Sequence, residues 1–321
     1  MTEPLRWGII STGGIAHTFV NDLQFTDSGV AVAVGSRSID AANTFADRFG
    51  IDHRYASYEE LVHDPDVDVV YVGTPHPMHF ANATLALEAG KPVLVEKAFT
   101  MSSREAVDLI ALAREKNLFL MEAMWTRFLP HVAAVNELIA AGEIGDIVAV
   151  EADHGQHFDF DPASRWFSPE LGGGALLDLG VYPVSFASML LGTPSKMVSM
   201  IDLAPTGVDR QVSMIFGYEN GAQAYLNTTT SAKTPTTATI SGTKARIEID
   251  GDFYAPTAFT FITRRGEQRR YDFPTQGRGL HYEAAEVARC VRGGLSESPL
   301  MPLSETESIM RTMETVLASS T

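Results

Sequence analysis

The sequence contains almost no cysteine. Cys290 is the only one among 321 residues, so no disulfide can form within the chain, and sparse cysteine is typical of proteins that work in reducing compartments. The first residues show no basic segment followed by a long apolar run, so we expect no signal peptide. No apolar run approaches the roughly 18 residues that a membrane-spanning helix needs. These absences predict a cytoplasmic protein that does not insert into a membrane.

Positive charge is scarce as well. The chain has 24 Lys and Arg residues against 40 Asp and Glu residues, which gives a formal net charge of −16. Nucleic acids and anionic membranes are bound through basic surfaces, so this balance argues against both as partners and leaves a small-molecule substrate. A length of 321 residues, with 45% hydrophobic and 20% charged residues, predicts a globular chain of two domains.

Apolar strands alternate with helices through the first part of the chain. Strand-like segments occupy residues 5–10, 30–36, 67–73, 92–95 and 118–122. This alternation, starting from a glycine turn, predicts a doubly wound α/β fold of the Rossmann type. We therefore predict a dinucleotide-binding domain over residues 1–122.

The second half has a different pattern. Between residues 147 and 263, several segments alternate apolar and polar residues with a period of two, which is typical of an antiparallel sheet with one covered face. We predict a substrate-binding domain over residues 123–321, built on a large open, mostly antiparallel β-sheet. The uncovered face of such a sheet predicts a homo-oligomer formed through it. The C-terminal helix is expected to pack back on the first domain.

The turn after the first strand is a variant of the dinucleotide fingerprint G-x-G-x-x-G/A. Gly13 and Ala16 fit its second and third positions, whereas Ser11 stands at the first. A glycine at position 13 lets the backbone approach a pyrophosphate, whose charge the N-terminus of the next helix stabilises. We expect Ser11, Thr12, Gly13, Ile15 and Ala16 to bind the cofactor.

The end of the second strand bears on the choice of cofactor. NAD enzymes usually place an acid there to bind the ribose hydroxyls, but this strand ends in Ser36 and Arg37. A guanidinium fork beside hydroxyl groups suits a 2′-phosphate. The sequence therefore predicts NADP rather than NAD. The alternative is that Arg37 is only a solvated residue at the entry of the next helix.

A histidine-containing loop follows the strand at 67–73. Two prolines keep this loop extended around Thr74, His76 and His79. We expect Thr74 and His76 to face the cofactor, and His79, which enters the next helix, to face the substrate. The two histidines could also be a metal pair, but no cysteine or carboxylate cluster accompanies them. We therefore expect no metal.

A charged pair, Glu96 and Lys97, follows the buried strand at 92–95. Ligands bind at the carboxyl ends of strands in open α/β sheets, so this pair is placed for chemistry. A surface ion pair at the end of a strand would have the same sequence. These residues alone do not separate the two interpretations.

Asp178 and Tyr182 form a second candidate pair. They are four residues apart and share one face if the segment is helical. Gly180 between them is unfavourable in a helix, which indicates close approach to another element. The alternative is an Asp178 that bonds the backbone and a Tyr182 that belongs to the core.

These motifs are jointly similar to those of one family. Ser11 to Gly13, Gly73 to Pro77, Glu96 with Lys97, residues 119–128 and Gly172 to Tyr182 resemble the glucose–fructose oxidoreductase, inositol dehydrogenase and MocA (Gfo/Idh/MocA) family. Within it, the chain looks most like the branch of dimeric dihydrodiol dehydrogenases, which are also NADP-dependent D-xylose dehydrogenases. The resemblance covers essentially the whole chain.

The resemblance implies hydride transfer between NADP and a secondary alcohol or hemiacetal carbon of a sugar, polyol or cyclic trans-dihydrodiol. Lys97 corresponds to the lysine of the family's E-K-P motif, whose proline is Ala98 here, Tyr182 to its helix tyrosine and Asp178 to the nearby acid. A nearby ammonium lowers the pKa of a tyrosine from about 10, so we expect Tyr182 to be the acid–base and Lys97 to assist it. The reverse assignment stays open. Glu96 is expected to position its neighbour or contact the cofactor.

The substrate walls are expected to include His79, Trp125 and Trp166, because flat rings stack on sugars and arenes. For Trp166, a core position is the alternative. Two other functions remain open. One is an aldose–aldose oxidoreductase that retains its NADP. The other is a non-catalytic NADP-binding regulator, which would have no use for Lys97 and Tyr182.

Overall fold

Two β-sheets are formed by residues 3–319, the residues that the computed structural model describes. Contacts divide the chain into two units, one of Met1–Phe128 with Thr275–Glu307 and the other of Leu129–Pro274 with Ser308–Thr321. The single boundary expected after residue 122 differs from this division, because the chain returns to the first unit near its C-terminus.

The first sheet has six parallel strands in the order β3-β2-β1-β4-β5-β6. Strands β4, β5 and β6 are buried along their whole length, as expected for a parallel sheet that helices cover on both faces. The order reverses between β1 and β4, and doubly wound folds bind ligands beyond the carboxyl ends of strands at this point. The strands are β1 (Leu5–Ile10), β2 (Gly29–Gly35), β3 (His53–Tyr55), β4 (Val69–Val72), β5 (Val93–Glu96) and β6 (Leu120–Ala123).

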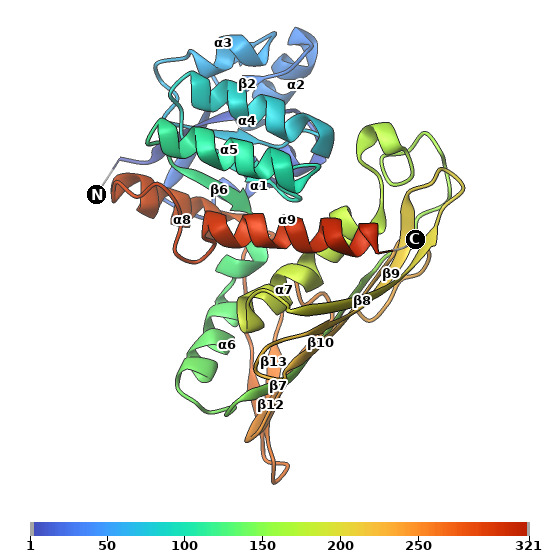
Figure 1. Ribbon diagram of the computed structural model, residues 1–321. Coiled ribbons are helices and arrows are strands. Elements are labelled where there is room, and N and C mark those ends of the chain that lie inside the picture. The colour runs from blue at the N-terminus through green and yellow to red at the C-terminus, as the bar shows by residue number, and fades with distance from the viewer. Residues whose placement is uncertain (1–2, 320–321) are drawn as a thin grey trace. The chain divides into compact units, whose positions relative to one another are not determined.

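Helices flank this sheet. Ser38, Ser57 and Ser102 each accept a backbone N–H from three residues later, which satisfies a donor at the start of a helix. Helix α4 lies beside α5 in Figure 1, and α8, from the far end of the chain, packs against α1. The helices are α1 (Gly14–Leu23), α2 (Ile39–Phe49), α3 (Tyr58–Val62), α4 (His79–Glu88), α5 (Ser103–Glu115) and α8 (Leu280–Arg292), with short 3₁₀ turns η1 (His76–Met78) and η2 (Trp125–Phe128).

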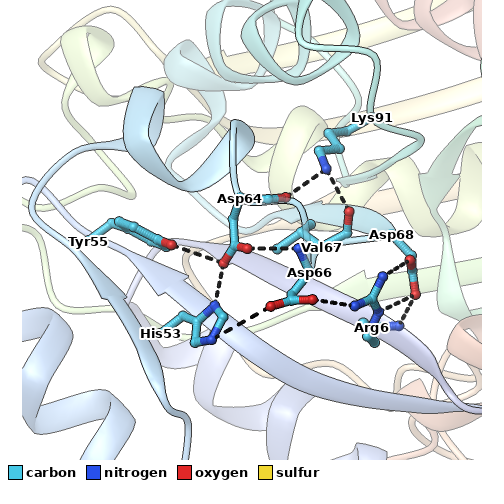
Figure 2. Close-up of polar contacts among 8 residues, drawn as sticks. All are labelled: Arg6, His53, Tyr55, Asp64, Asp66, Val67, Asp68 and Lys91. Atoms are coloured by element: carbon cyan, nitrogen blue, oxygen red, sulfur yellow. Dashed lines mark hydrogen bonds and ion pairs between the residues drawn. The ribbon is translucent and has the colours of Figure 1, made fainter.

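A polar network lies beside β3 and near the amino ends of β1 and β4 (Figure 2). Asp64 is its centre, with a side chain that is only 1% exposed. Its Oδ2 accepts hydrogen bonds from His53 Nδ1 (2.6 Å) and the Tyr55 hydroxyl (3.0 Å), and its Oδ1 accepts one from the backbone N–H of Asp66 (2.8 Å). We call this set the amino-edge network. Its members are Arg6, His53, Tyr55, Asp64, Asp66, Asp68 and Lys91.

Two cations complete the amino-edge network. Arg6 binds Asp66 (2.7 Å) and Asp68 (2.8 Å) through its guanidinium group. Lys91 Nζ donates to the backbone carbonyls of Asp64 (2.8 Å) and Val67 (2.7 Å). The network therefore joins the loop before β4 to β1, to β3 and to Lys91, which lies two residues before β5.

The second sheet has eight strands in the order β14-β13-β12-β11-β7-β10-β9-β8. Strands β7 and β10 pair in parallel and the other neighbours are antiparallel, which agrees with the mostly antiparallel sheet expected from the sequence. The strands are β7 (Ile147–Gly155), β8 (Lys196–Leu203), β9 (Asp209–Gly217), β10 (Gln223–Thr229), β11 (Ala238–Gly242), β12 (Ala245–Ile249), β13 (Phe259–Thr263) and β14 (Gln268–Tyr271).

Helix α7 (Val181–Leu191) packs against β7 and β10. It follows the 3₁₀ turn η3 (Pro169–Leu171) and a π-helical turn, η4 (Leu176–Gly180), and α6 (Pro130–Ala140) lies in the same unit. The stretch Pro169–Leu191 is long and apolar enough to cross a membrane, but 78% of its most apolar window is buried inside the protein. This burial is typical of a core helix. Helix α9 (Leu303–Ala318) begins in the first unit and ends in the second.

The sheet also carries a row of exposed apolar side chains. Val198 (68% exposed) and Met200 (78%) project from β8, Ile215 (48%) from β9 and Tyr225 (42%) from β10. In β10, Tyr225 alternates with the buried Ala224 and Leu226, so it points to the opposite face of the sheet. These residues help to line a groove of about 570 Å³.

Candidate active site

The turn after β1 has the shape that a glycine usually provides. Ser11 has a φ of 132°, a region that side chains with a Cβ rarely enter. Its Oγ accepts a hydrogen bond from the N–H of Gly13 (3.0 Å), and its own N–H donates to the carbonyl of Gly35 in β2 (3.3 Å). Ser11 thus takes the conformation of the first glycine of the fingerprint and replaces part of its role with a hydrogen bond from its side chain.

The N-terminus of α1 has room for a phosphate group. No side chain caps this helix, and no acid lies in its first turn. A Cβ built on Gly13 would approach only Ser11 Oγ within 3.4 Å, and one on Gly14 would meet nothing within 4 Å. Thr12 is half-buried, Ile15 is 38% exposed and Ala16 is fully buried beneath the turn. The open backbone donors therefore fit the pyrophosphate of a dinucleotide.

Arg37 lies just beyond the end of β2. Ser36 is buried and Arg37 is exposed. The guanidinium group of Arg37 lies near the Tyr58 hydroxyl and opposes the rise in the pKa of Tyr58 that burial causes. No acid occupies the last position of β2, which is Gly35. A cationic group next to hydroxyl groups is the donor set that a 2′-phosphate would need.

His76 and His79 hold the loop around Lys97. His76 Nε2 donates to the carbonyl of Lys97 (3.1 Å), while the ring nitrogens of His79 face the carbonyls of Thr74 (2.7 Å) and Ala98 (2.9 Å). Burial lowers the pKa of His79 to about 4, so its ring is neutral at pH 7 and donates to one of the two carbonyls. His79 is 0% exposed, so the predicted substrate contact is wrong for this residue. It joins two loops instead.

Glu96 fixes the backbone next to Lys97. It is the last residue of β5 and 5% exposed. Its Oε1 accepts a hydrogen bond from the Tyr71 hydroxyl (2.6 Å), and its Oε2 accepts one from the backbone N–H of Lys97 (3.2 Å). Lys97 itself is half-buried. The structure therefore places Glu96, Lys97 and His76 together at the carboxyl edge of the sheet.

Trp125 follows β6 directly. Its ring is 6% exposed, so little of it is available to a substrate within the first unit. Close by in the chain, Arg127 binds Glu305 at the start of α9 (2.6 Å), with an Arg127 side chain that is only 3% exposed. Glu122 in β6 is fully buried, and neither carboxylate oxygen has a hydrogen-bond partner among the described residues. Burial raises the pKa of Glu122 to about 7.

The second unit holds Asp178 and Tyr182. Both residues are 6% exposed. Asp178 lies in the π-helical turn η4 and pairs with Arg165 (3.4 Å), whereas Tyr182 lies in the first turn of α7. A Cβ on Gly180 would come within 3.0 Å of Thr228 in β10, which explains why a glycine is needed between them. Single π turns are frequent at functional sites because they redirect side chains.

Aromatic rings surround Tyr182. Its ring centroid lies 4.6 Å from that of Tyr254 and 5.3 Å from that of His154. His154 and Tyr254 stack on each other at 4.3 Å. Sequence reasoning did not assign either residue to the site. The sequence signal for His154 was the alternation of side chains along β7, because His154 lies on the same buried face as Val150 and Ala152.

Trp166 is partly covered by its neighbours. Its ring stacks on Phe158 with centroids 3.8 Å apart, and the guanidinium group of Arg165 lies 3.6 Å from its centre. The side chain is half-buried. The same arginine therefore links Trp166 to Asp178. Arg165 thus contacts both the flat ring of Trp166 and the carboxylate of Asp178, the predicted acid.

A possible metal ligand set lies elsewhere. His53, Asp64 and Asp66 bring donor atoms within 4.8 Å of one another. The donors are already bonded to one another and to Arg6, and a guanidinium group beside Asp66 opposes the binding of a cation. These residues belong to the amino-edge network and not to the carboxyl edge.

An open helix N-terminus after β1, an arginine after β2 and a lysine after β5 define the class of a dinucleotide-dependent oxidoreductase. The model of the oxidoreductase family with an NAD-binding Rossmann fold matches residues 5–124, and that of the GFO/IDH/MocA C-terminal domain matches residues 132–248. The chain belongs to the GFO/IDH/MocA family, and it is a dehydrogenase.

Curated relatives match along almost the whole chain. Trans-1,2-dihydrobenzene-1,2-diol dehydrogenase of Xenopus tropicalis is 39% identical over 325 residues, which covers 97% of each chain. The enzyme of the same name from Homo sapiens is 37% identical over 324 residues, which covers 97% of this chain and 96% of the relative.

Solved structures share the fold. The aldose-aldose oxidoreductase of Caulobacter crescentus, complexed with glycerol, has a TM-score of 0.90 and is 24% identical, covering 99% of this chain and 97% of that one. The 3-ketoreductase KijD10 of Actinomadura kijaniata, in complex with NADP and TDP-benzene, has a TM-score of 0.86 at 25% identity, covering 99% and 98%. At 24% identity, the first of these supports the fold alone.

Proposed function

We propose that this protein is an NADP-dependent dehydrogenase that oxidises a secondary alcohol or hemiacetal carbon of a cyclic trans-dihydrodiol, sugar or polyol. The observation that carries the cofactor half of this proposal is the turn at Ser11, whose φ of 132° leaves the N-terminus of α1 open. The substrate class is supported by relatives that are named trans-1,2-dihydrobenzene-1,2-diol dehydrogenase and are 37% to 39% identical along almost the full length.

The preference for NADP over NAD is proposed from Arg37. The exposed guanidinium group stands after β2, where an acid would bind the ribose hydroxyls of NAD. Ser36 supplies a hydroxyl beside it. Ser11, Thr12, Gly13, Ile15 and Ala16 would bind the pyrophosphate, with Thr74, His76 and Glu96 beside the rest of the cofactor.

In the proposed mechanism, NADP supplies the nicotinamide ring that accepts hydride from the substrate carbon. Tyr182 takes the proton of the substrate hydroxyl as general base. Lys97 carries an ammonium that lowers the pKa of the phenol from its ordinary value of about 10, and Asp178 orients one member of the pair. Glu96 holds the backbone of Lys97 through its carboxylate (3.2 Å).

The substrate would bind against flat rings. Trp125 and Trp166 remain the proposed walls, and the rings of His154 and Tyr254 support Tyr182 from within the second unit. Stacking on an arene or on the apolar face of a sugar suits such rings. Arg165, which pairs with Asp178 (3.4 Å), would keep the acid in place.

We further propose a homo-oligomer, a homodimer in its simplest form, joined through the exposed face of the second sheet. Apolar side chains that are 42% to 78% exposed on three adjacent strands are better explained by a covered surface than by a solvated one. A cytoplasmic location is proposed from the single cysteine, Cys290, which is buried as a free thiol.

The experiment is a substrate panel followed by NADPH absorbance. Trans-1,2-dihydrobenzene-1,2-diol, D-xylose and a polyol would be offered with NADP and with NAD. We expect turnover of the diol or xylose with NADP, and loss of about tenfold or more in NADP preference for Arg37→Ser. Purified protein that carries stoichiometric NADP would favour the aldose–aldose oxidoreductase instead. Tight NADPH binding without turnover would favour a regulator.

A further inference from the structure

Glu283 is a buried acid that the proposed mechanism does not use. It lies in the first turn of α8 and is 0% exposed. Neither of its carboxylate oxygens has a hydrogen-bond partner among residues 3–319. An ionised carboxylate without partners is very unfavourable in a protein interior, so such a group takes up a proton instead.

The groups that face Glu283 are also acids. Burial raises its pKa well above the ordinary value, and the carboxylates of Glu96 and Asp22 raise it further. The dipole of α8 favours negative charge in its first turn, but this effect is small next to full burial beside two acids. Burial and the two neighbouring acids therefore favour the protonated, uncharged form of Glu283.

The two facing acids differ in what they bind. Asp22 accepts hydrogen bonds from the backbone N–H groups of Arg278 (2.8 Å) and Leu280 (2.9 Å), so its charge caps α8. Glu96 accepts from the Tyr71 hydroxyl (2.6 Å) and from the backbone N–H of Lys97 (3.2 Å). Of the two, only Glu96 connects Glu283 to the proposed catalytic lysine.

Other elements that pack against α8 add little charge at this point. They are α1, β2 and η2. Helix α1 supplies Asp22, and η2 supplies Arg127, whose guanidinium group binds Glu305 (2.6 Å). His281, on α8 itself, packs against Tyr282 and the ring of Phe25.

We propose that Glu283 and Glu96 share one negative charge, and that Glu283, the protonated member, is a positioning residue for the dehydrogenase reaction. If both acids were ionised in the protein interior, their repulsion would favour the return of a proton to one of them. A protonated Glu96 would be a weaker acceptor for the N–H of Lys97. The polar, uncharged Glu283 keeps Glu96 ionised and thereby keeps the backbone of Lys97 in place.

Substitutions at position 283 separate this role from packing. Glu283→Gln keeps a polar, uncharged group of the same shape. Glu283→Leu keeps the volume but surrounds Glu96 with apolar atoms, which raises the pKa of Glu96. Glu286→Gln, one turn along the same helix, is the matched control, because Glu286 binds Arg289 (2.7 Å) and the hydroxyl of Ser298 and is not among the acids that face Glu283.

The measurements are thermal stability, the affinity for NADPH and the pH profile of kcat/KM with NADP and trans-1,2-dihydrobenzene-1,2-diol. We expect Glu283→Leu to be as stable as the wild type or more so, since a buried unpartnered acid is removed. The acid limb of its kcat/KM profile should move to higher pH by about one unit. At pH values below this limb, kcat/KM should be about tenfold lower than that of the wild type. The affinity for NADPH should not change. Glu283→Gln should keep the wild-type acid limb, and Glu286→Gln should change stability alone.

An acid limb of Glu283→Leu that coincides with that of the wild type would overturn the proposal. Should that variant fail to fold, infrared spectra of the wild type and Glu283→Gln at pH 7 decide: the band of a protonated carboxylic acid must disappear in the variant, and identical spectra would overturn the proposal. The inference rests on the proposed dehydrogenase function. Absence of turnover by the wild type would count against that function, whereas the infrared comparison still tests the acid pair.

Discussion

Buried acids at the two ends of the first sheet have opposite surroundings. At the amino end, burial alone would raise the pKa of Asp64, but hydrogen bonds from His53, Tyr55 and a backbone N–H outweigh burial and lower it. Near the carboxyl end, Glu122 and Glu283 are equally buried and have no hydrogen-bond partners among the described residues. A satisfied network stabilises the fold, whereas unsatisfied acids destabilise it and are retained where function needs them.

The largest effect should come from Lys97→Met at the carboxyl end. In the proposed mechanism, removing the ammonium leaves the phenol of Tyr182 near its ordinary pKa of about 10, so we expect kcat/KM at pH 7 to fall about 10²- to 10⁴-fold. The melting temperature should stay close to that of the wild type. NADPH absorbance and calorimetry measure the two quantities. Lys91→Met, in the amino-edge network, is the matched control. It should lower the melting temperature and leave kcat/KM close to that of the wild type.

Asp64→Ala should disrupt the amino-edge network and lower the stability of the protein. Its side chain is 1% exposed and accepts from His53, Tyr55 and the N–H of Asp66, so its loss leaves several donors unsatisfied. We expect the free energy of unfolding to fall by about 3 kcal/mol. The kcat/KM of the folded fraction at 25 °C should not change. Denaturant titration measures the first quantity, and a loss of kcat/KM matching that of Lys97→Met would contradict the division of roles.

Glu122→Gln should make the protein more stable. The folded pKa of Glu122 is about 7 against an ordinary value of 4.5, so the unfolded chain loses this proton first and stability falls as pH rises from 4.5 through 7. The variant lacks this loss and should be more stable by about 2 kcal/mol at pH 8. At pH 4 the two proteins should have the same free energy of unfolding. Equal stability at both pH values would show that Glu122 is ionised without penalty.

The smallest effect is expected for His53→Gln. The hydrogen bond to Asp64 raises the pKa of His53 above 6.5, so the stabilisation is fully present below pH 6.5 and is lost as pH rises through the folded value. Because the side chain is 37% exposed, the difference should be less than about 1 kcal/mol. Chemical denaturation of both proteins at pH 5.5 and pH 9 measures it. If the difference in the free energy of unfolding were larger at pH 9 than at pH 5.5, the hydrogen bond to Asp64 would not be raising the pKa of His53.

The doubly wound fold of the first domain was predictable because five of the six strands of its sheet are short apolar runs that alternate with helices. Two strands were not predictable in this way. β3 is three half-buried residues long, and β14, Gln268–Tyr271, has no apolar run. Both form because a neighbouring strand offers unpaired backbone groups, a tertiary effect that local sequence does not encode.

The candidate site was predictable where a motif fixes a backbone position. Ser11 was expected at a glycine position, and its φ of 132° agrees. Asp178 and Tyr182 were expected to share one face if their segment is helical, and Asp178 instead lies in a π turn, Leu176–Gly180, that precedes the α-helix of Tyr182. Glu283 was missed, although it interrupts the apolar stripe of Leu280, Val287 and Cys290. An acid on the apolar face of a helix indicates a buried carboxyl group, so the position of Glu283 was detectable from the sequence.

Asp22 has a consequence for how the protein is made. This residue of α1 is 0% exposed and bonds the backbone of residues 278 and 280, more than 250 positions later in the chain. During synthesis, the interior of the first unit is therefore completed only after residues 278–280 have emerged, and residues 129–274 of the second unit emerge before them. A fragment that stops after residue 122 would leave the Asp22 carboxylate without these two donors. We therefore expect that residues 1–122 do not form a stable domain on their own.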